Sequence, residues 1–329
     1  MNNELDLKNL IEGFKLSCQT ENKSIKTIEW YTCFLQRFLQ FLQLNNYPIR
    51  VSEIDKTHIR AFILYLQQWA KTPHTKKPLS NSTVQGYIRT LKVFFSWLLR
   101  EEYIESNAMT RIPVPRAPVK VINTFSNEHI NKLATLCHTS NGTGYRNLAI
   151  ILLLLDSGIR VSELVNIDIN DLDLTEGYIK IRKAKGNRER LVPIGSIVQK
   201  SLWKYINHHR PQPLTQKVTM LFLSEQGLPL TRSGIQQMLR RYGKVAGFSG
   251  VRCSPHTFRH TFAKNFLLNG GDIFSLQKIL GHSSLASVRI YLNLFAVDLK
   301  KQHQQFSPVD NLIKVRSLYT HVRSIKQTL

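Results

Sequence analysis

Apolar positions in the first 110 residues recur at the spacing of amphipathic helices. In the segment 24–43 they mark one helix face, at Ile28, Tyr31, Leu35, Phe38 and Leu42. Side chains three and four residues apart lie on the same side of a helix. Two more helices are expected after Asp55 and Ser80, because each can cap a helix and stands between apolar residues at hydrophobic-staple positions. The pattern predicts a small helical bundle.

A proline-rich stretch, RIPVPRAPVKV at 111–121, ends this pattern. It has three prolines within six residues, which cannot continue a helix and favour an extended connector. We therefore predict an N-terminal helical domain at 1–110, a linker at 111–122, a second domain at 123–310 and a basic tail at 311–329.

The second domain combines helices with a short strand pattern. One helix is expected after Ser126, and a buried helix over 145–155 should stop at Gly158, since glycine suits the left-handed position that ends a helix. Residues 178–181 and 190–194 flank a turn-prone Gly-Asn, which predicts two strands joined by a basic turn.

A third strand candidate is MLFLS at 220–224, and the rest of this domain is expected to be helical. The expected fold class is therefore mainly α with a small antiparallel β-sheet.

The net charge of the chain indicates the class of its partner. There are 45 Lys+Arg against 22 Asp+Glu, a formal net charge of +23. Such an excess repels itself in a compact chain and indicates a polyanionic partner, with nucleic acid first. A membrane surface is the alternative, but the basic residues run through the whole chain rather than gather in one amphipathic helix or polybasic block. We expect no membrane partner.

Cysteine usage and the N-terminal sequence indicate a compartment. The N-terminus, MNNELDLKNL, lacks the apolar core of a signal peptide. The longest apolar run, 148–155, is too short to span a bilayer. The cysteines have no metal-ligand spacing and are typical of reduced cytoplasmic thiols: Cys18, Cys33, Cys137 and Cys253. We expect a cytoplasmic, nucleoid-associated protein.

Two basic segments offer phosphate contacts. In SGIRVSEL, Arg160 opens a new helix after a glycine, and Glu163 one turn later can orient its guanidinium fork. In KAKGNRER, Lys185 stands beside Gly186, which lets the backbone approach a groove closely. Taken singly, a solvated surface arginine and a solvated basic turn are the alternatives.

A third segment, PHTFRHTFA, places His256 and Arg259 three residues apart on one helix face. His256 and His260 have the spacing of a zinc-binding HExxH helix, but Thr257 stands where the glutamate base would be. We therefore expect no metal, and His260 to pack or hydrogen-bond locally.

The fourth segment, LGHSSLASVRIY, has His282 after a glycine helix stop and Tyr291 nine residues later. By itself, a tyrosine between two aliphatic residues is typical of a core position.

In this order and spacing, the four segments resemble the tyrosine recombinase family, also called phage integrases, and in particular its Xer-like and transposon-encoded bacterial members. The resemblance covers the whole chain and implies an N-terminal SAM-like, core-binding helical domain followed by an α+β catalytic domain. Val288 stands where many members have threonine, a position without a catalytic role. The matching positions imply these catalytic residues: Arg160, Lys185, His256, Arg259, His282 and Tyr291.

The resemblance implies site-specific recombination of DNA without metal, ATP or another cofactor. Tyr291 would attack the scissile phosphate and form a 3′-phosphotyrosine. The two arginines and His282 would bind the phosphate oxygens, Lys185 would protonate the leaving 5′ oxygen, and His256 would take the tyrosine proton.

The implied partner is double-stranded DNA with an inverted-repeat core site. Four protomers, of this chain or with a related recombinase, would act on two paired sites, with or without accessory DNA-bending proteins. Two alternatives stay open: a type IB topoisomerase-like enzyme that relaxes DNA without site choice, and a non-catalytic DNA-binding protein of the same fold.

Overall fold

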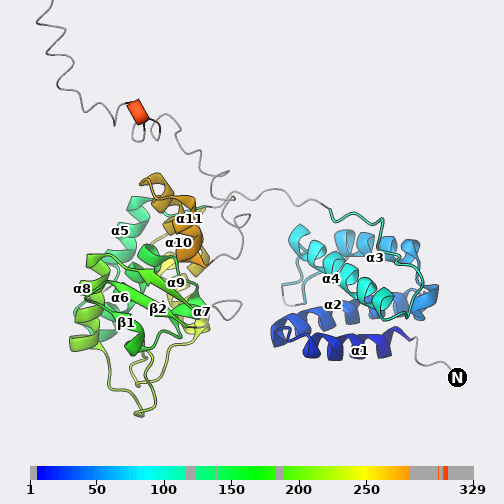
Figure 1. The fold of residues 1–329 in the computed structure, drawn as a ribbon, viewed down its shortest axis with the longest axis horizontal. Coiled ribbons are helices and arrows are strands. Elements are labelled where there is room, and N and C mark those ends of the chain that lie inside the picture. Colours follow the sequence, from blue (N-terminus) through cyan, green and yellow to red (C-terminus); the bar gives the residue numbers. More distant parts are fainter. Residues whose placement is uncertain are drawn as a thin grey trace, which may run out of the picture. The chain divides into compact units, whose positions relative to one another are not determined.

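The computed structural model in Figure 1 divides the chain into two units, Met1–Lys120 and Val121–Leu329. The structure describes residues 6–73, 75–115, 123–137, 139–182, 189–281, 303 and 307–309.

The first unit is built from helices throughout its described residues. In chain order they are α1 (Leu7–Thr20), α2 (Ile25–Leu44), the short 3-10 helix η1 (Val51–Glu53), α3 (Lys56–Gln68) and α4 (Asn81–Arg100). The three helices predicted from apolar spacing are confirmed as α2, α3 and α4. Ser24, Asp55 and Ser80 each accept a hydrogen bond from a backbone N–H in the first turn of the helix that follows, so local capping sets where these helices begin.

Aromatic rings fill the centre of this bundle. Phe38, Phe62 and Phe94 have no exposed surface, and the ring centroids of Phe38 and Phe62 lie 5.0 Å apart. Buried side chains from all four α-helices form one apolar cluster. Removal of these faces from water is the main favourable contribution to the stability of the unit.

The second unit is mostly helical. Before its sheet lie α5 (Asn127–Thr135), α6 (Gly142–Ser157), α7 (Val161–Leu164) and η2 (Ile169–Asp171). After the sheet lie α8 (Ser196–Lys204), the π-helical turn η3 (Tyr205–His209), α9 (Arg232–Val245), α10 (Pro255–Leu268) and α11 (Ile273–Leu280). Within the residues described, none of the helices of either unit is long and apolar enough to cross a membrane.

Three antiparallel strands form the sheet, in the order β1–β2–β3. They are β1 (Leu172–Asp173), β2 (Tyr178–Ile181) and β3 (Arg190–Pro193). Ile179 pairs with Val192, and both are fully buried, whereas the residues next to them along the strands are exposed. One face of the sheet therefore packs on the core. The predicted pair of strands and the predicted fold class are confirmed, although β3 ends at Pro193, one residue earlier than expected.

The third strand candidate, residues 220–224, is wrong. Met220 and Leu223 take part only in isolated bridges. The Arg210 side chain donates to the carbonyl oxygens of Met220 and Leu221, at 2.7 and 3.0 Å. The backbone of this segment pairs at single points, where Leu221 donates to Ile167 and Leu230 donates to Phe222, so bridges form but no ladder extends along it. Its apolar character reflects burial in the core rather than strand pairing.

Helix α6 runs through the apolar core of the second unit and ends beside α10. Ile150, Ile151 and Leu154 have no exposed surface, and α6 contacts α8, η3 and α10. The helix stops at Gly158, as predicted, with a φ of +58°. A Cβ at this position would lie 2.4 Å from Phe262 on α10. Glycine therefore satisfies both the left-handed backbone and the close approach of the two helices.

Candidate functional site

Both predicted catalytic arginines lie in the second unit, where the ends of α6 and α11 meet. Arg160 directly precedes α7, and its Nη2 donates to the carbonyl oxygen of Gly281 at 3.3 Å. Arg259 lies on α10 and donates to the carbonyl oxygens of Gly158, at 2.8 Å, and Leu280, at 2.7 Å. Gly158 ends α6 and Gly281 ends α11, both in the left-handed conformation. The last carbonyls of a helix lack partners and carry partial negative charge, which favours cations there.

The two guanidinium groups differ in their exposure. Arg259 is 6% exposed, whereas the side chain of Arg160 is 28% exposed. Arginine has five N–H donors, and among the described residues Arg160 uses two side-chain hydrogen bonds, to Glu163 and Gly281. Arg160 therefore keeps donors for an anion arriving from solvent, in the planar fork that matches a phosphate.

Glu163 is the carboxylate of this cluster, and its side chain is 2% exposed. The backbone N–H and Nη1 of Arg160 both donate to it at 2.9 Å, which confirms the predicted pairing of the two residues. Arg190 binds both carboxylate oxygens, at 3.0 and 2.8 Å. Burial raises the pKa of Glu163, but the hydrogen bonds and charges of Arg190 and Arg160 outweigh burial, so the pKa lies below its ordinary value. Glu163 is therefore ionised at neutral pH.

Arg190 is a member of the cluster that the sequence motifs did not identify. It is the first residue of β3 and pairs with the buried Ile181 across the sheet. Side chains alternate along a strand, so Arg190 shares the inward face of β3 with the buried Val192. An arginine at an inward position of a predicted strand was the signal available in the sequence.

Replacing Glu163 with glutamine should destabilise the second unit at neutral pH. Removing one partner of a buried ion pair leaves uncompensated charge and typically costs about 3–5 kcal/mol. Because the folded-state pKa of Glu163 is depressed, its contribution is fully present above its unfolded value, near 4.5, and is lost as the pH falls through the folded pKa. The difference in unfolding free energy between the native protein and Glu163→Gln should therefore shrink below about pH 4.5.

Denaturant unfolding at a series of pH values measures this difference. Glu12→Gln is the matched control, because Glu12 pairs with Lys15 on an exposed helix surface, where ion pairs contribute about 0–1 kcal/mol. Equal losses for the two variants at pH 7 would contradict the role of Glu163.

His256 and His260 lie on the same helix, α10, in different surroundings. His256 is exposed in the first turn, and His260 is half-buried. Burial lowers the pKa of His260, and the charges of His256 and Arg259 lower it further, so this imidazole is mainly neutral at pH 7. Across the residues that the structure describes, no three or more His, Cys, Asp or Glu side chains form a group that could hold a metal ion.

Lys185, His282 and Tyr291 lie outside the described residues, and their roles stay predictions. Their nearest described neighbours along the chain are nevertheless informative. Arg182 and Glu189 border the segment that contains Lys185. Gly281, which accepts a hydrogen bond from Arg160, directly precedes His282 in the sequence.

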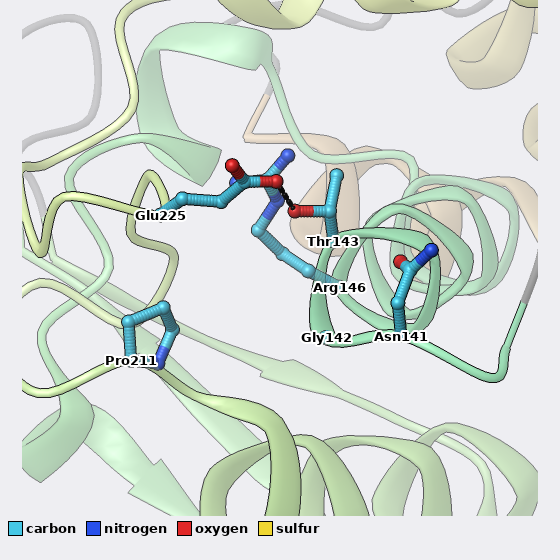
Figure 2. A pocket seen from close by; sticks show the side chains of 6 residues that line it. All are labelled: Asn141, Gly142, Thr143, Arg146, Pro211 and Glu225. Carbon is cyan, nitrogen blue, oxygen red and sulfur yellow. Dashed lines mark hydrogen bonds between the residues drawn. The ribbon is translucent and has the colours of Figure 1, made fainter.

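A cavity of about 470 Å³ lies apart from the arginine cluster, at the start of α6. Figure 2 shows Thr143 and Glu225 in its wall, joined by a hydrogen bond of 2.5 Å. Nearby, Arg146 donates to the carbonyl oxygen of Leu223 at 2.8 Å. The 16 residues of α6 span about 24 Å at 1.5 Å per residue, so this cavity and the cluster at Gly158 lie at opposite ends of the helix. The cavity is therefore not part of the arginine site.

Two family models match the chain and together cover most of it. The model described as "Phage integrase family" matches residues 123–296. The model described as "Phage integrase, N-terminal SAM-like domain" matches residues 10–105.

Several curated proteins are similar over most of their length. Tyrosine recombinase XerD of Staphylococcus haemolyticus is 35% identical over 230 residues, which cover 70% of this chain and 77% of the relative. Tyrosine recombinase XerD of Staphylococcus epidermidis is 30% identical over 304 residues, which cover 92% and 99%. Tyrosine recombinase XerC of Oceanobacillus iheyensis is 31% identical over 313 residues, which cover 94% and 98%.

Solved structures share the fold at lower identity. The XerH site-specific recombinase bound to a palindromic difH substrate aligns with a TM-score of 0.68 at 22% identity, covering 88% of this chain and 81% of that one. The Tn1549 transposon integrase in complex with transposon right end DNA aligns with a TM-score of 0.71 at 18% identity, covering 92% and 99%.

Proposed function

The chain belongs to the phage integrase family and is a tyrosine-type site-specific recombinase, and we propose that it breaks and rejoins DNA through Tyr291. The catalytic residues would be the six that the sequence motifs indicate: Arg160, Lys185, His256, Arg259, His282 and Tyr291. We also propose the domain plan of a helical core-binding domain at 1–110, a linker at 111–122, a catalytic domain at 123–310 and a basic tail at 311–329.

The observation that supports this proposal most strongly is the meeting of Arg160 and Arg259 at the ends of α6 and α11. Arg160 and Arg190 both pair with Glu163, and Arg259 binds the carbonyl oxygens at the same helix ends. Among these four described residues, three guanidinium groups and one carboxylate leave an excess of positive charge. Cleavage of a phosphodiester without metal needs positive groups that bind the negatively charged non-bridging oxygens. A preorganised donor of this kind typically lowers a barrier by about 3–4 kcal/mol.

The proposed reaction exchanges one ester bond for another. The Tyr291 oxygen bonds to phosphorus and the bond from phosphorus to the 5′ oxygen breaks, which leaves a 3′-phosphotyrosine and a 5′-hydroxyl. A tyrosine hydroxyl has a pKa near 10 and needs a base at neutral pH, and the exposed His256 is our candidate. Lys185 would supply the proton to the 5′ oxygen. A 5′-hydroxyl from another strand reverses the step and rejoins DNA without ATP.

The proposed partner is double-stranded DNA that carries an inverted-repeat core site. The net charge of +23 supports a polyanionic partner. Of the structural neighbours, XerH was solved with a difH substrate and the Tn1549 integrase with transposon DNA. We propose that four protomers act on two paired sites in the cytoplasm, with or without accessory DNA-bending proteins. Four protomers and two duplexes should be counted by mass photometry, and a stable single protomer on each recombining duplex would refute the tetramer.

A nicked suicide duplex tests the chemistry directly. Cleavage beside the nick releases a short oligonucleotide, so rejoining is blocked and the covalent complex accumulates. We expect duplexes drawn from DNA that flanks the gene to yield a complex that survives denaturation, with the adduct mapped to Tyr291 by mass spectrometry of digested peptides. An adduct on another residue would overturn the assignment. Relaxation of supercoiled plasmid that lacks any target would indicate the topoisomerase-like alternative.

A further inference from the structure

We propose that Arg190 is a positioning residue of the cleavage site, which balances the charge of Glu163 and so leaves Arg160 available to the scissile phosphate. This inference rests on the proposed function, because it concerns the same arginine cluster.

Arg190 joins three elements of the second unit. Its Nη1 and Nη2 bind the two oxygens of Glu163 on α7, and its Nε donates to the carbonyl oxygen of Ile279 on α11 at 2.8 Å. Its own backbone belongs to β3, and its side chain is 11% exposed. A Cβ at Gly281 would lie 3.0 Å from Arg190 Cζ, so the guanidinium also packs against the turn that ends α11. Every nitrogen of this side chain is therefore committed within the protein.

Two of the four hydrogen bonds on Glu163 come from the Arg190 guanidinium. The other two come from Arg160, one from its backbone N–H and one from Nη1. Arg190 is held by the strand and by α11, whereas Arg160 is more exposed and reaches towards solvent. A buried carboxylate demands a compensating cation. Arg190 supplies that cation, and it does not face the scissile phosphate. Without Arg190, Arg160 alone would compensate the charge of Glu163. The Arg160 guanidinium would then be neutralised by the carboxylate and turned towards it, away from the phosphate.

The chain offers a control residue just after the other strand of the same pair. Arg182 directly follows β2, and its Nε donates to Asp171 at 2.5 Å. The side chain of Asp171 is 3% exposed, so Arg182 also pairs with a buried carboxylate. Among the described residues, Arg182 makes no hydrogen bond to Glu163 or Arg160. Arg190→Gln and Arg182→Gln each remove one positive charge from a buried carboxylate, and only Arg190 bonds to Glu163. The Arg182 side chain is the more exposed of the two, at 56% against 11%.

The test compares rates of covalent complex formation on the nicked suicide duplex, in single-turnover conditions with saturating protein. We expect Arg190→Gln to cleave about 10- to 100-fold more slowly than the native protein, the size of effect that a misplaced catalytic group produces. Arg182→Gln should stay within about twofold to threefold of the native rate. DNA affinity should fall equally in both variants, since each loses one positive charge.

A double-mutant cycle separates positioning from general destabilisation. If Arg190 acts through Glu163, the variant Glu163→Gln/Arg190→Gln should be no slower than the slower single variant, whereas Glu163→Gln/Arg182→Gln should show multiplied losses. Loss of the Arg190 hydrogen bonds should also raise the pKa of Glu163, so the acidic fall in cleavage rate should begin at a higher pH in Arg190→Gln than in the native protein. The two profiles are compared only at pH values where circular dichroism shows both proteins folded, because a purely structural role would shift the profile only through unfolding.

Two failures remain distinguishable. If the native protein forms an adduct on Tyr291 and Arg190→Gln forms it as fast as Arg182→Gln, the role of Arg190 is refuted and the proposed function stands. If the native protein forms no adduct, the proposed function itself fails. Should Arg190→Gln not fold, Arg190→Lys serves in the same cycle, because lysine keeps the charge but cannot bind Glu163 in a fork and Ile279 together.

Discussion

Phenylalanine at position 291 should leave the protein able to bind its DNA but unable to become attached to it. The substitution removes the hydroxyl that we propose as the nucleophile and keeps the size and apolar character of the ring. With the nucleophile absent, no oxygen attacks the phosphate that the arginine cluster would bind. We expect covalent complex on the nicked duplex to fall by about a thousandfold or more, as it does when a nucleophile is removed from a catalytic group that acts as a unit. Affinity depends mainly on phosphate contacts and should stay within about twofold.

The comparison requires a second tyrosine of the catalytic unit. Tyr178 lies on β2 and is 41% exposed, so Tyr178→Phe should form the adduct at the native rate. Native adduct levels in Tyr291→Phe would place the nucleophile elsewhere. Unchanged recombination by that variant without any covalent adduct would exclude phosphotyrosine chemistry.

The elements that the sequence predicts well are those with local causes. Ser24, Asp55 and Ser80 cap helices because each side chain bonds to backbone within its own next turn. Gly158 ends α6 because its backbone adopts a left-handed conformation. The pairing of Arg160 with Glu163 spans a single turn, so spacing alone was enough to predict it.

The features that spacing could not reveal have causes elsewhere in the chain. Residues 220–224 have the apolar character of a strand, but Arg210 takes two of their carbonyl oxygens. In the sequence, Arg190 begins a predicted strand beside a basic turn, and only the fold brings β3 against α7 and α11. A hydrophobic pattern records which side chains are buried, and does not record which distant group satisfies a backbone oxygen.

The same distinction applies within the candidate site. Motif order indicated that Arg160 and Arg259 belong together, but it could not indicate how. In the structure, Gly158 and Gly281 supply the answer, because Arg259 binds carbonyl oxygens at the ends of both helices and Arg160 binds the carbonyl oxygen of Gly281. The glycine stops that helped to locate the motifs in the sequence therefore also form part of the scaffold of the site.

Lysine in place of Arg259 should show how much of the site depends on that scaffold. Arg259 bridges the carbonyl oxygens of Gly158 and Leu280 with two different nitrogens. A lysine ammonium is a point charge and cannot span both while presenting a planar fork to phosphate. We expect cleavage on the nicked duplex to slow by about 100- to 1000-fold, the usual cost of losing one preorganised donor to the transition state. Because the net charge is unchanged, DNA affinity should change little.

The variant should also lose stability, since a buried carbonyl oxygen left without a donor costs about 1–3 kcal/mol. Arg252→Lys is the control: Arg252 is exposed just before α10, and its replacement should alter neither the cleavage rate nor the unfolding midpoint. Single-turnover cleavage and thermal unfolding of both variants separate the two effects. If Arg259→Lys lost stability but cleaved DNA at the native rate, Arg259 would only hold α6 and α11 together and would not act in catalysis. Unfolding of part of the Arg259→Lys sample lowers the cleavage rate only in proportion to the unfolded fraction. A much larger loss places the Arg259 guanidinium on the reacting phosphate, because the cleavage rate of bound DNA depends only on interactions that are stronger in the transition state than in the ground state.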